Sequence, residues 1–223
     1  PAYPAGVSQT EMYTMYRDMG VGAVRLFSPA KPKVLSHDGV KYDFSALDSS
    51  LKLAEMNGFK VLVPMGSGAP SAVPDWLRTE VEAGNVSLTE GLFTQRLKKR
   101  VKKDKQPFLD IDKYEQYLGK VFGFFGDRAH FVEIWNEPGH KFSPEDTIRL
   151  ASATRDVKDK LGSSFLLLGF SSTKGRGTGQ GGDPERLPEF FQDVIRLGGA
   201  DLVDGISYHS GHAFRFLGES HDS

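Results

Sequence analysis

An amide and a carboxyl group follow directly on an apolar run near the middle of the chain. Residues 131–135 (FVEIW) are mostly β-branched or aromatic, and Asn136, Glu137 and Pro138 come next. The run predicts a strand, which Pro138 ends because proline has no N–H to donate to a ladder. A carboxyl group at the end of a strand can give and take a proton, and an amide beside it can bind a polar substrate. An α/β barrel collects its reactive groups at this end of its strands.

Apolar periodicity predicts that helices and strands alternate along the chain. Each predicted strand is a nearly continuous apolar run and follows a predicted helix. Strands of that kind are covered on both faces, which indicates a parallel sheet with helices outside it. The predicted strands are 21–27, 60–65, 131–135, 165–172 and 202–209. The first predicted helix is 8–19, and apolar residues mark four more at 47–54, 114–125, 150–161 and 187–195.

Two of these helices carry specific expectations. The helix after Ser143 should begin there, because a capping hydroxyl is followed by Pro144 at the first helical position, and its inner face should extend to Leu161. The first helix has an apolar stripe at helical spacing, which we expect to face the core: Met12, Met15, Tyr16 and Met19.

A parallel sheet of this kind closes either as an open, doubly wound sheet or as a (β/α)8 barrel. An open sheet would concentrate its polar groups at one switch point, whereas a barrel mouth pools them from several strands. In this chain they fall at or near the ends of at least three predicted strands, which favours the barrel: Arg25, Asn136, Glu137, Tyr208 and His209.

Composition restricts the classes of function. The chain has 223 residues with 39% hydrophobic side chains, so we expect one large domain or most of one. Its 28 basic and 29 acidic residues nearly cancel, which gives the whole chain no electrostatic attraction to nucleic acid or to an anionic membrane. It has no cysteine, so disulfides, thiolate metal sites and cysteine nucleophiles are excluded. No apolar run approaches the ~20 residues of a membrane span.

The motifs together resemble the retaining glycoside hydrolases of clan A. The resemblance rests on Asn136-Glu137-Pro138 after the central strand, Arg25 in the strand two before it, and the ending ISYH (206–209) two strands later. The segment 42–48, which reads YDFSALD, and the segment 58–64, which reads GFKVLVP, are most similar to the family that contains β-xylosidases and α-L-iduronidases. The resemblance extends from the first helix to the last strand and implies a (β/α)8 barrel that cleaves glycosidic bonds.

The resemblance also implies roles for single residues. Glu137 would be the general acid/base of a double displacement, which retention requires beside a second, ionised carboxylate. Apolar neighbours such as Trp135 would help Glu137 to hold its proton. Asn136 would bind the 2-hydroxyl of the sugar. Arg25 would donate to the nucleophile or, alternatively, form a buried structural ion pair.

Three further residues have two interpretations each. His209 or Tyr208 would orient the nucleophile or touch the sugar, although Tyr208 could equally be a packing residue. Trp76 could stack on a sugar ring or pack against the barrel rim.

The nucleophile of clan A is a Glu at the end of the seventh strand, and no strand is predicted after His209. We therefore expect residues 1–223 to hold strands two to six of the barrel, without the first, seventh and eighth. The missing strands would arrive on a second polypeptide or in a longer molecule. The competing interpretation is a catalytically inactive carbohydrate-binding barrel, or a fragment of a split enzyme. Gly211 departs from the family, which usually has an aromatic residue two positions after the His.

The segment 66–110 is predicted to be a long irregular loop. It contains Trp76 and a basic run over 96–105, which is either solvated surface or attracts an acidic substrate. The glycine-rich loop 177–182 matches a dinucleotide motif but lacks the following acidic residue, so we interpret it as a mouth loop. His209 and His212 have no third ligand nearby, and we expect no metal and no cofactor. No signal defines the location, and we favour a secreted, periplasmic or lysosomal enzyme over a cytoplasmic one.

Overall fold

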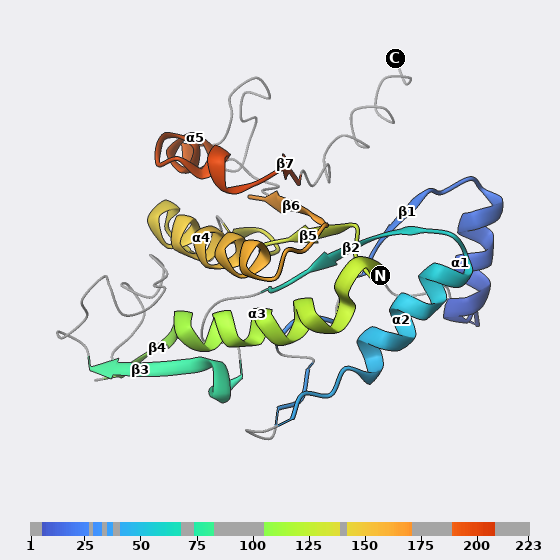
Figure 1. The fold of residues 1–223 in the computed structure, drawn as a ribbon, viewed down its shortest axis with the longest axis horizontal. Helices are drawn as coiled ribbons and strands as arrows, with labels where there is room; N and C mark the ends of the chain where they lie inside the picture. The colour runs from blue at the N-terminus through green and yellow to red at the C-terminus, as the bar shows by residue number, and fades with distance from the viewer. Residues whose placement is uncertain are drawn as a thin grey trace, which may run out of the picture.

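Five parallel strands form one sheet at the centre of the molecule (Figure 1). The computed structural model describes residues 6–26, 29–32, 35–37, 41–67, 74–82, 105–138, 142–170 and 189–207. The strands are β1 (Ala23–Arg25), β2 (Lys60–Pro64), β5 (Phe131–Glu133), β6 (Leu166–Gly169) and β7 (Gly205–Ile206). Their order in the sheet is β1-β2-β5-β6-β7, which is also their order in the chain. The described strands therefore have no switch point, which excludes the doubly wound arrangement for them and fits a barrel.

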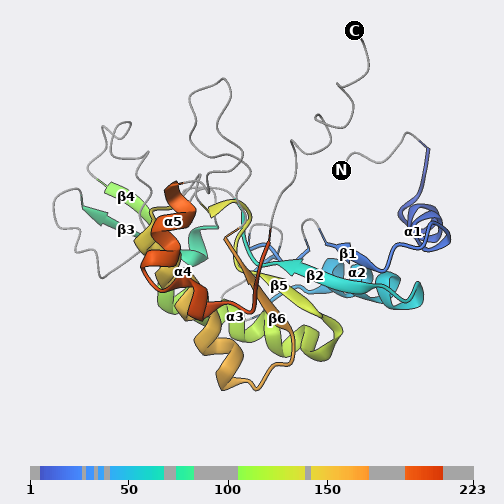
Figure 2. The same cartoon turned by 90° about the horizontal axis from the view of Figure 1, so that it is seen from above.

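Helices cover one face of this sheet (Figures 1 and 2). In chain order they are α1 (Gln9–Asp18), α2 (Ser45–Met56), α3 (Ile111–Phe125), α4 (Pro144–Lys160) and α5 (Glu189–Arg196). Neighbours in the chain pack side by side, α3 against α4 and α4 against α5. The predicted start of α4 is confirmed, since the Ser143 hydroxyl accepts from the Asp146 N–H at 3.1 Å and Pro144 is the first helical residue.

The main core lies between the sheet and the helices. Val61 and Val63 of β2, Val132 of β5 and Leu167 of β6 are fully buried there. Phe165 lies edge-on to Phe122 and Phe125 of α3, with ring centroids 4.9 and 5.7 Å away. Because side chains alternate along a strand, the residues between them point to the opposite, concave face.

The concave face is only partly covered within the described residues. The register places Leu62, Phe131 and Leu166 side by side on three neighbouring strands. Leu166 is 48% exposed, whereas the adjacent Leu167 on the helix side is fully buried. The concave face thus retains exposed apolar surface at Leu166, and on the helix side Ile206 of β7 is also exposed, at 57%.

The prediction of an irregular segment over 66–110 was wrong in part. A short 3₁₀ helix (Asp75–Leu77) leads into β3 (Arg78–Glu82), which pairs antiparallel with β4 (Lys105–Leu109). The two strands form a separate sheet beside the start of α3 (Figure 1). Antiparallel pairing satisfies backbone groups that a plain loop would leave to water.

The predicted core stripes were also wrong at individual positions. Met15 and Met19 are 55% and 75% exposed, and Tyr13 is the buried residue of α1. Met12 and Tyr16 do pack partly against the core. The physical reason is that α1 lies at the end of the helical layer, beside α2, so less of its surface is covered (Figure 1). Leu161 is exposed because it is the C-cap of α4 and not part of its inner face.

None of the helices in the described part of the chain is long and apolar enough to span a membrane.

Candidate active site

The C-terminal end of β5 is held by the continuation of β2. The Asn136 N–H donates to the Gly66 carbonyl at 2.9 Å, and Ser67 forms a parallel bridge with Asn136. A Cβ on Gly66 would lie 2.0 Å from the Trp135 ring, so only glycine allows this approach. Trp135 is itself fully buried, against Tyr114 and Phe142. Asn136 is therefore fixed by backbone pairing on a rigid aromatic base.

Glu137 has a backbone conformation that side chains other than glycine rarely adopt. Its φ angle is +54°, in the left-handed region. Such a conformation costs roughly 1–3 kcal/mol and persists where the surrounding structure enforces it, as at many functional sites. Glu137 is half-buried and follows Asn136 at the end of the central strand, so the strain falls on the predicted acid/base.

Arg25 connects β1 to the end of β5. Its Nε donates to Glu133 Oε2 at 3.0 Å, its Nη2 contacts the same oxygen, and Nη2 also donates to Asn136 Oδ1 at 2.9 Å. The predicted ion pair of Arg25 therefore exists, with Glu133 as its partner. Contact of Arg25 with a nucleophile stays a prediction.

Glu133 is a polar residue of this site that the sequence interpretation missed. Its side chain is fully buried, and its Oε1 accepts from the Ser207 hydroxyl at 2.6 Å. Ser207 directly follows β7, so Glu133 contacts residues from both edge strands of the described sheet. The available signal was a single acidic residue inside an apolar run.

Lys31 was also missed. It is 7% exposed, and burial and the positive charge of Arg25 lower its pKa, while the charge of Glu133 opposes that change. The described site thus brings two cations, Arg25 and Lys31, close to one buried carboxylate, Glu133.

Trp76 lies in an aromatic cluster over α3. Its ring centroid is 4.6 Å from that of His37, 5.6 Å from that of Tyr42 and 6.1 Å from that of Tyr117. The Tyr117 hydroxyl in turn donates to the Met65 carbonyl at 3.0 Å, which links the cluster to the end of β2. These contacts are those of a packing residue, and stacking of Trp76 on a sugar stays a prediction.

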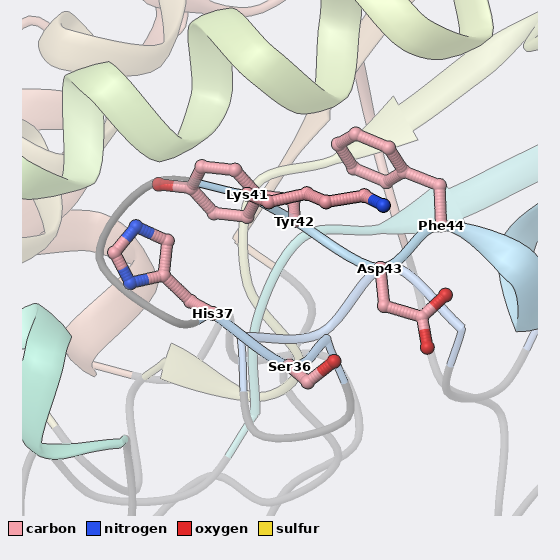
Figure 3. A pocket seen from close by; sticks show the side chains of 6 residues that line it. All are labelled: Ser36, His37, Lys41, Tyr42, Asp43 and Phe44. Atoms are coloured by element: carbon pink, nitrogen blue, oxygen red, sulfur yellow. The ribbon is translucent and has the colours of Figure 1, made fainter.

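A pocket of about 610 Å³ lies beside this cluster. Figure 3 shows the rings of His37, Tyr42 and Phe44 together on one side of the segment that carries them. An antiparallel bridge between His37 and Tyr42 fixes this segment. Phe44 also stacks on Phe124 of α3 at 4.3 Å, so the rings serve as packing between the segment and the helix.

Several predicted features lie outside the described residues. They are Tyr208, His209 and His212, the glycine-rich loop 177–182, and residues 96–104 of the basic run. Within the described ranges, no three His, Asp or Glu side chains are grouped so as to hold a metal ion.

The sheet order and the polar cluster on the concave face together define the class of fold. Arg25 lies in the first strand of the sheet, Glu133 in the third, and Ser207 directly after the fifth, and yet they form one connected set of hydrogen bonds. Side chains from such distant strands meet when a sheet curls as in a barrel. The chain thus has the fold of a (β/α)8 barrel, of which the described residues contain five consecutive parallel strands.

Comparison with solved structures agrees with this class. The chain is similar to a family 39 glycoside hydrolase from the gut symbiont Bacteroides cellulosilyticus WH2 (TM-score 0.58, 21% identity, covering 92% of this chain and 36% of that one). It is similar to a family 10 xylanase from Bispora sp. MEY-1 solved with xylobiose (TM-score 0.58, 13% identity, 93% and 60%). It is also similar to a family 30 endoxylanase from Clostridium papyrosolvens C71 (TM-score 0.52, 15% identity, 91% and 46%).

At these identities the likeness shows the fold, that of glycoside hydrolase barrels, and not the family. The chain spans 36% to 60% of the length of these three structures. No family model matches the sequence, and no curated protein matches it.

Proposed function

We propose that this chain is the part of a retaining glycoside hydrolase that carries the general acid/base, Glu137. The observation that carries the proposal is the end of β5, where Asn136 and a strained Glu137 follow the central strand of a glycoside-hydrolase type of barrel. In the proposed reaction the Glu137 carboxyl protonates the leaving oxygen, and a second carboxylate attacks the anomeric carbon. Water, deprotonated by Glu137, then releases the sugar.

The amide of Asn136 is proposed to bind the sugar's 2-hydroxyl, a contact that strengthens in the transition state. Its position supports this role, since Asn136 is adjacent to Glu137 and half-buried at the same strand end. Tyr208 and His209 follow Ser207 and are proposed to contact the sugar or the nucleophile. We place the nucleophile on a strand that the described sheet does not contain.

Hydrolysis of aryl glycosides by the complete protein tests the proposal. Replacing Glu137 with Gln keeps the shape and removes the transferable proton, so kcat/KM should fall about 10²–10⁴-fold for a poor leaving group. The loss should be smaller for dinitrophenyl glycosides, whose leaving group needs little protonation. Glu145→Gln is the matched control, because Glu145 is an exposed acid in the first turn of α4. An inactive carbohydrate-binding barrel would show equal rates for wild type and Glu137→Gln.

We also propose that further polypeptide completes the barrel, either within a longer molecule or as a second fragment. The half-exposed Leu166 on the concave face and the single pairing partners of β1 and β7 in the described sheet support this proposal. Intact mass measurement of the native protein tests it. A monomeric, cooperatively folding 24.6 kDa species with no second polypeptide would contradict it.

An acidic sugar is the substrate that the charges favour. Two cations, Arg25 and Lys31, lie close to Glu133, and the sequence carries a basic run over 96–105. We propose that aryl uronides are cleaved with a higher kcat/KM than the corresponding xylosides. Equal values, or a preference for xylosides, would remove the acidic substrate and leave the proposed reaction intact.

A further inference from the structure

Glu133 is a fully buried carboxylate that the proposed reaction does not use. The register puts Glu133 on the concave face, two residues after Phe131 on the same strand. There it accepts hydrogen bonds from Arg25 and from Ser207. It lies three residues before Asn136 in the chain and is linked to Asn136 through the guanidinium of Arg25.

The contact between Arg25 and Asn136 fixes the orientation of the amide. Arg25 has only donors, so its Nη2 at 2.9 Å requires the oxygen of the amide, Oδ1, to face it. The amide NH₂ group must then point away from Arg25. An NH₂ group is a donor, and it can bind an oxygen of a sugar hydroxyl.

Arg25 alone would hold this orientation less well. The Arg25 side chain is 26% exposed, and a long, partly exposed side chain loses rotamer freedom when it is held in one position. Nε and Nη2 of the guanidinium both contact one oxygen of Glu133, Oε2, and this shared acceptor restrains the plane of the guanidinium. Ser207 holds the other oxygen of Glu133 from the opposite side at 2.6 Å.

A purely structural role does not explain why position 133 carries a carboxylate. Burying an ion pair gains little stability over apolar residues of similar volume, because both charges lose their hydration. An apolar side chain at position 133 would continue the run FVEIW, whose neighbours Val132 and Ile134 are buried. The charge at position 133 is therefore better explained by what it orients.

We infer that Glu133 is a positioning residue for recognition of the sugar's 2-hydroxyl, acting through Arg25 on the amide of Asn136. The inference rests on the proposed function and adds to it a residue that touches neither the substrate nor the scissile bond. Ser207 is the second member of the same arrangement, since it restrains Glu133. Loss of Glu133 lowers the preference for substrates that carry a 2-hydroxyl more than it lowers binding of the rest of the sugar.

The test compares an aryl glycoside with its 2-deoxy analogue in the complete protein. The measured quantity is the ratio of the two kcat/KM values, and also the ratio of the two Kd values in a Glu137→Gln background, where turnover is blocked. In Glu133→Gln we expect each ratio to fall about tenfold or more towards that of Asn136→Ala, as for the loss of one charge-assisted hydrogen bond. In Ser207→Ala, a milder change, we expect a fall of about two- to threefold.

Phe165→Leu is the matched control for general destabilisation. Phe165 is buried directly before β6, at the end of the strand opposite Asn136, and packs against Phe122 and Phe125 of α3. It should lower the melting temperature and leave both ratios unchanged. If Glu133→Gln does not fold, the Ser207→Ala ratio decides.

The experiment distinguishes failure of this inference from failure of the proposed function. Wild-type ratios in Glu133→Gln and Ser207→Ala, with an active parent protein, would overturn the inference and keep the proposed function. A complete protein that neither cleaves nor binds glycosides would overturn the proposed function and this inference together.

Discussion

The guanidinium of Arg25 and the carboxylate of Glu133 form an ion pair across the concave face of the sheet, with strand β2 lying between their own strands. The two residues are 108 positions apart in the chain, and the carboxylate has no exposed surface. Each charge is therefore neutralised by the other, and the ion pair connects β1, at the edge of the described sheet, to the central strand β5.

Removing one partner of this pair should destabilise the protein strongly. Arg25→Met leaves Glu133 buried beside fewer donors, and we expect the free energy of unfolding to fall by about 3–5 kcal/mol. The double variant Arg25→Met/Glu133→Leu removes both charges and should recover most of that loss. Urea denaturation measures both values. A double variant no more stable than Arg25→Met would show that the charge imbalance is not the cause.

The backbone at Glu137 gives a second prediction. Because glycine adopts a positive φ without strain, Glu137→Gly should be more stable than Glu137→Ala by about 1–2 kcal/mol, while both lose activity. Glu115, within α3, is the control position, where glycine should be less stable than alanine by about 1 kcal/mol. Thermal unfolding of the four variants checks the two orders. The same order at both positions would argue against strain at Glu137.

Gly66 should tolerate no side chain. In Gly66→Ala the new Cβ would meet the Trp135 ring at 2.0 Å, so the indole or the strand must move, at a cost of about 1–3 kcal/mol. Trp135 is one of two tryptophans, and its fluorescence should change. The matched change Gly123→Ala, in α3 with nothing within 4 Å, should instead stabilise by about 0.5–1 kcal/mol. An unchanged emission spectrum and stability for Gly66→Ala would contradict the close contact.

Asp204 should make stability sensitive to acid. Partial burial raises the pKa of Asp204. Hydrogen bonds from the Leu167 N–H and from Arg155 lower it by more, so the pKa lies below its ordinary value of 3.8. A carboxylate with a depressed pKa stabilises the fold above its unfolded-state pKa, and that contribution disappears as the pH falls through the folded-state value.

Asp204→Asn should therefore lower the free energy of unfolding at pH 7 by roughly 1–3 kcal/mol, and the difference from wild type should shrink below about pH 4. Urea melts between pH 3 and pH 7 measure this difference, with Asp201→Asn, at an exposed position of the preceding 3₁₀ helix (Gly199–Leu202), as the control. A difference that stays constant with pH would exclude the charge of Asp204 as its origin.

The sequence predicts the main sheet because each of its strands is an apolar run between helices. It also favours the barrel, since polar residues fall at the ends of several predicted strands, and two of these residues, Arg25 and Asn136, meet in the structure. It does not predict β3 and β4, because residues 78–82 (RTEVE) and 105–109 (KQPFL) are polar or contain proline and resemble a loop. Pairing between them decides their structure, and pairing is not a local property.

The sequence also predicts only some residues of the candidate site. Asn136 and Glu137 lie at a recognisable strand end, whereas Glu133 is one acid within an apolar run. Only the register of three strands shows that Glu133 lies on the same face of the sheet as Arg25. Lys31 gives no sign of burial in the sequence, because its surroundings are assembled from distant segments.

The agreement between strand order and chain order affects the chain while it is being made. Each strand can pair with the strand synthesised before it, and β1 is the first of the five to emerge. The partner of Arg25, Glu133, belongs to the third of these strands, so the ion pair can form only after β5 has been made. The polar cluster on the concave face is therefore assembled late, once β1, β2 and β5 are all present.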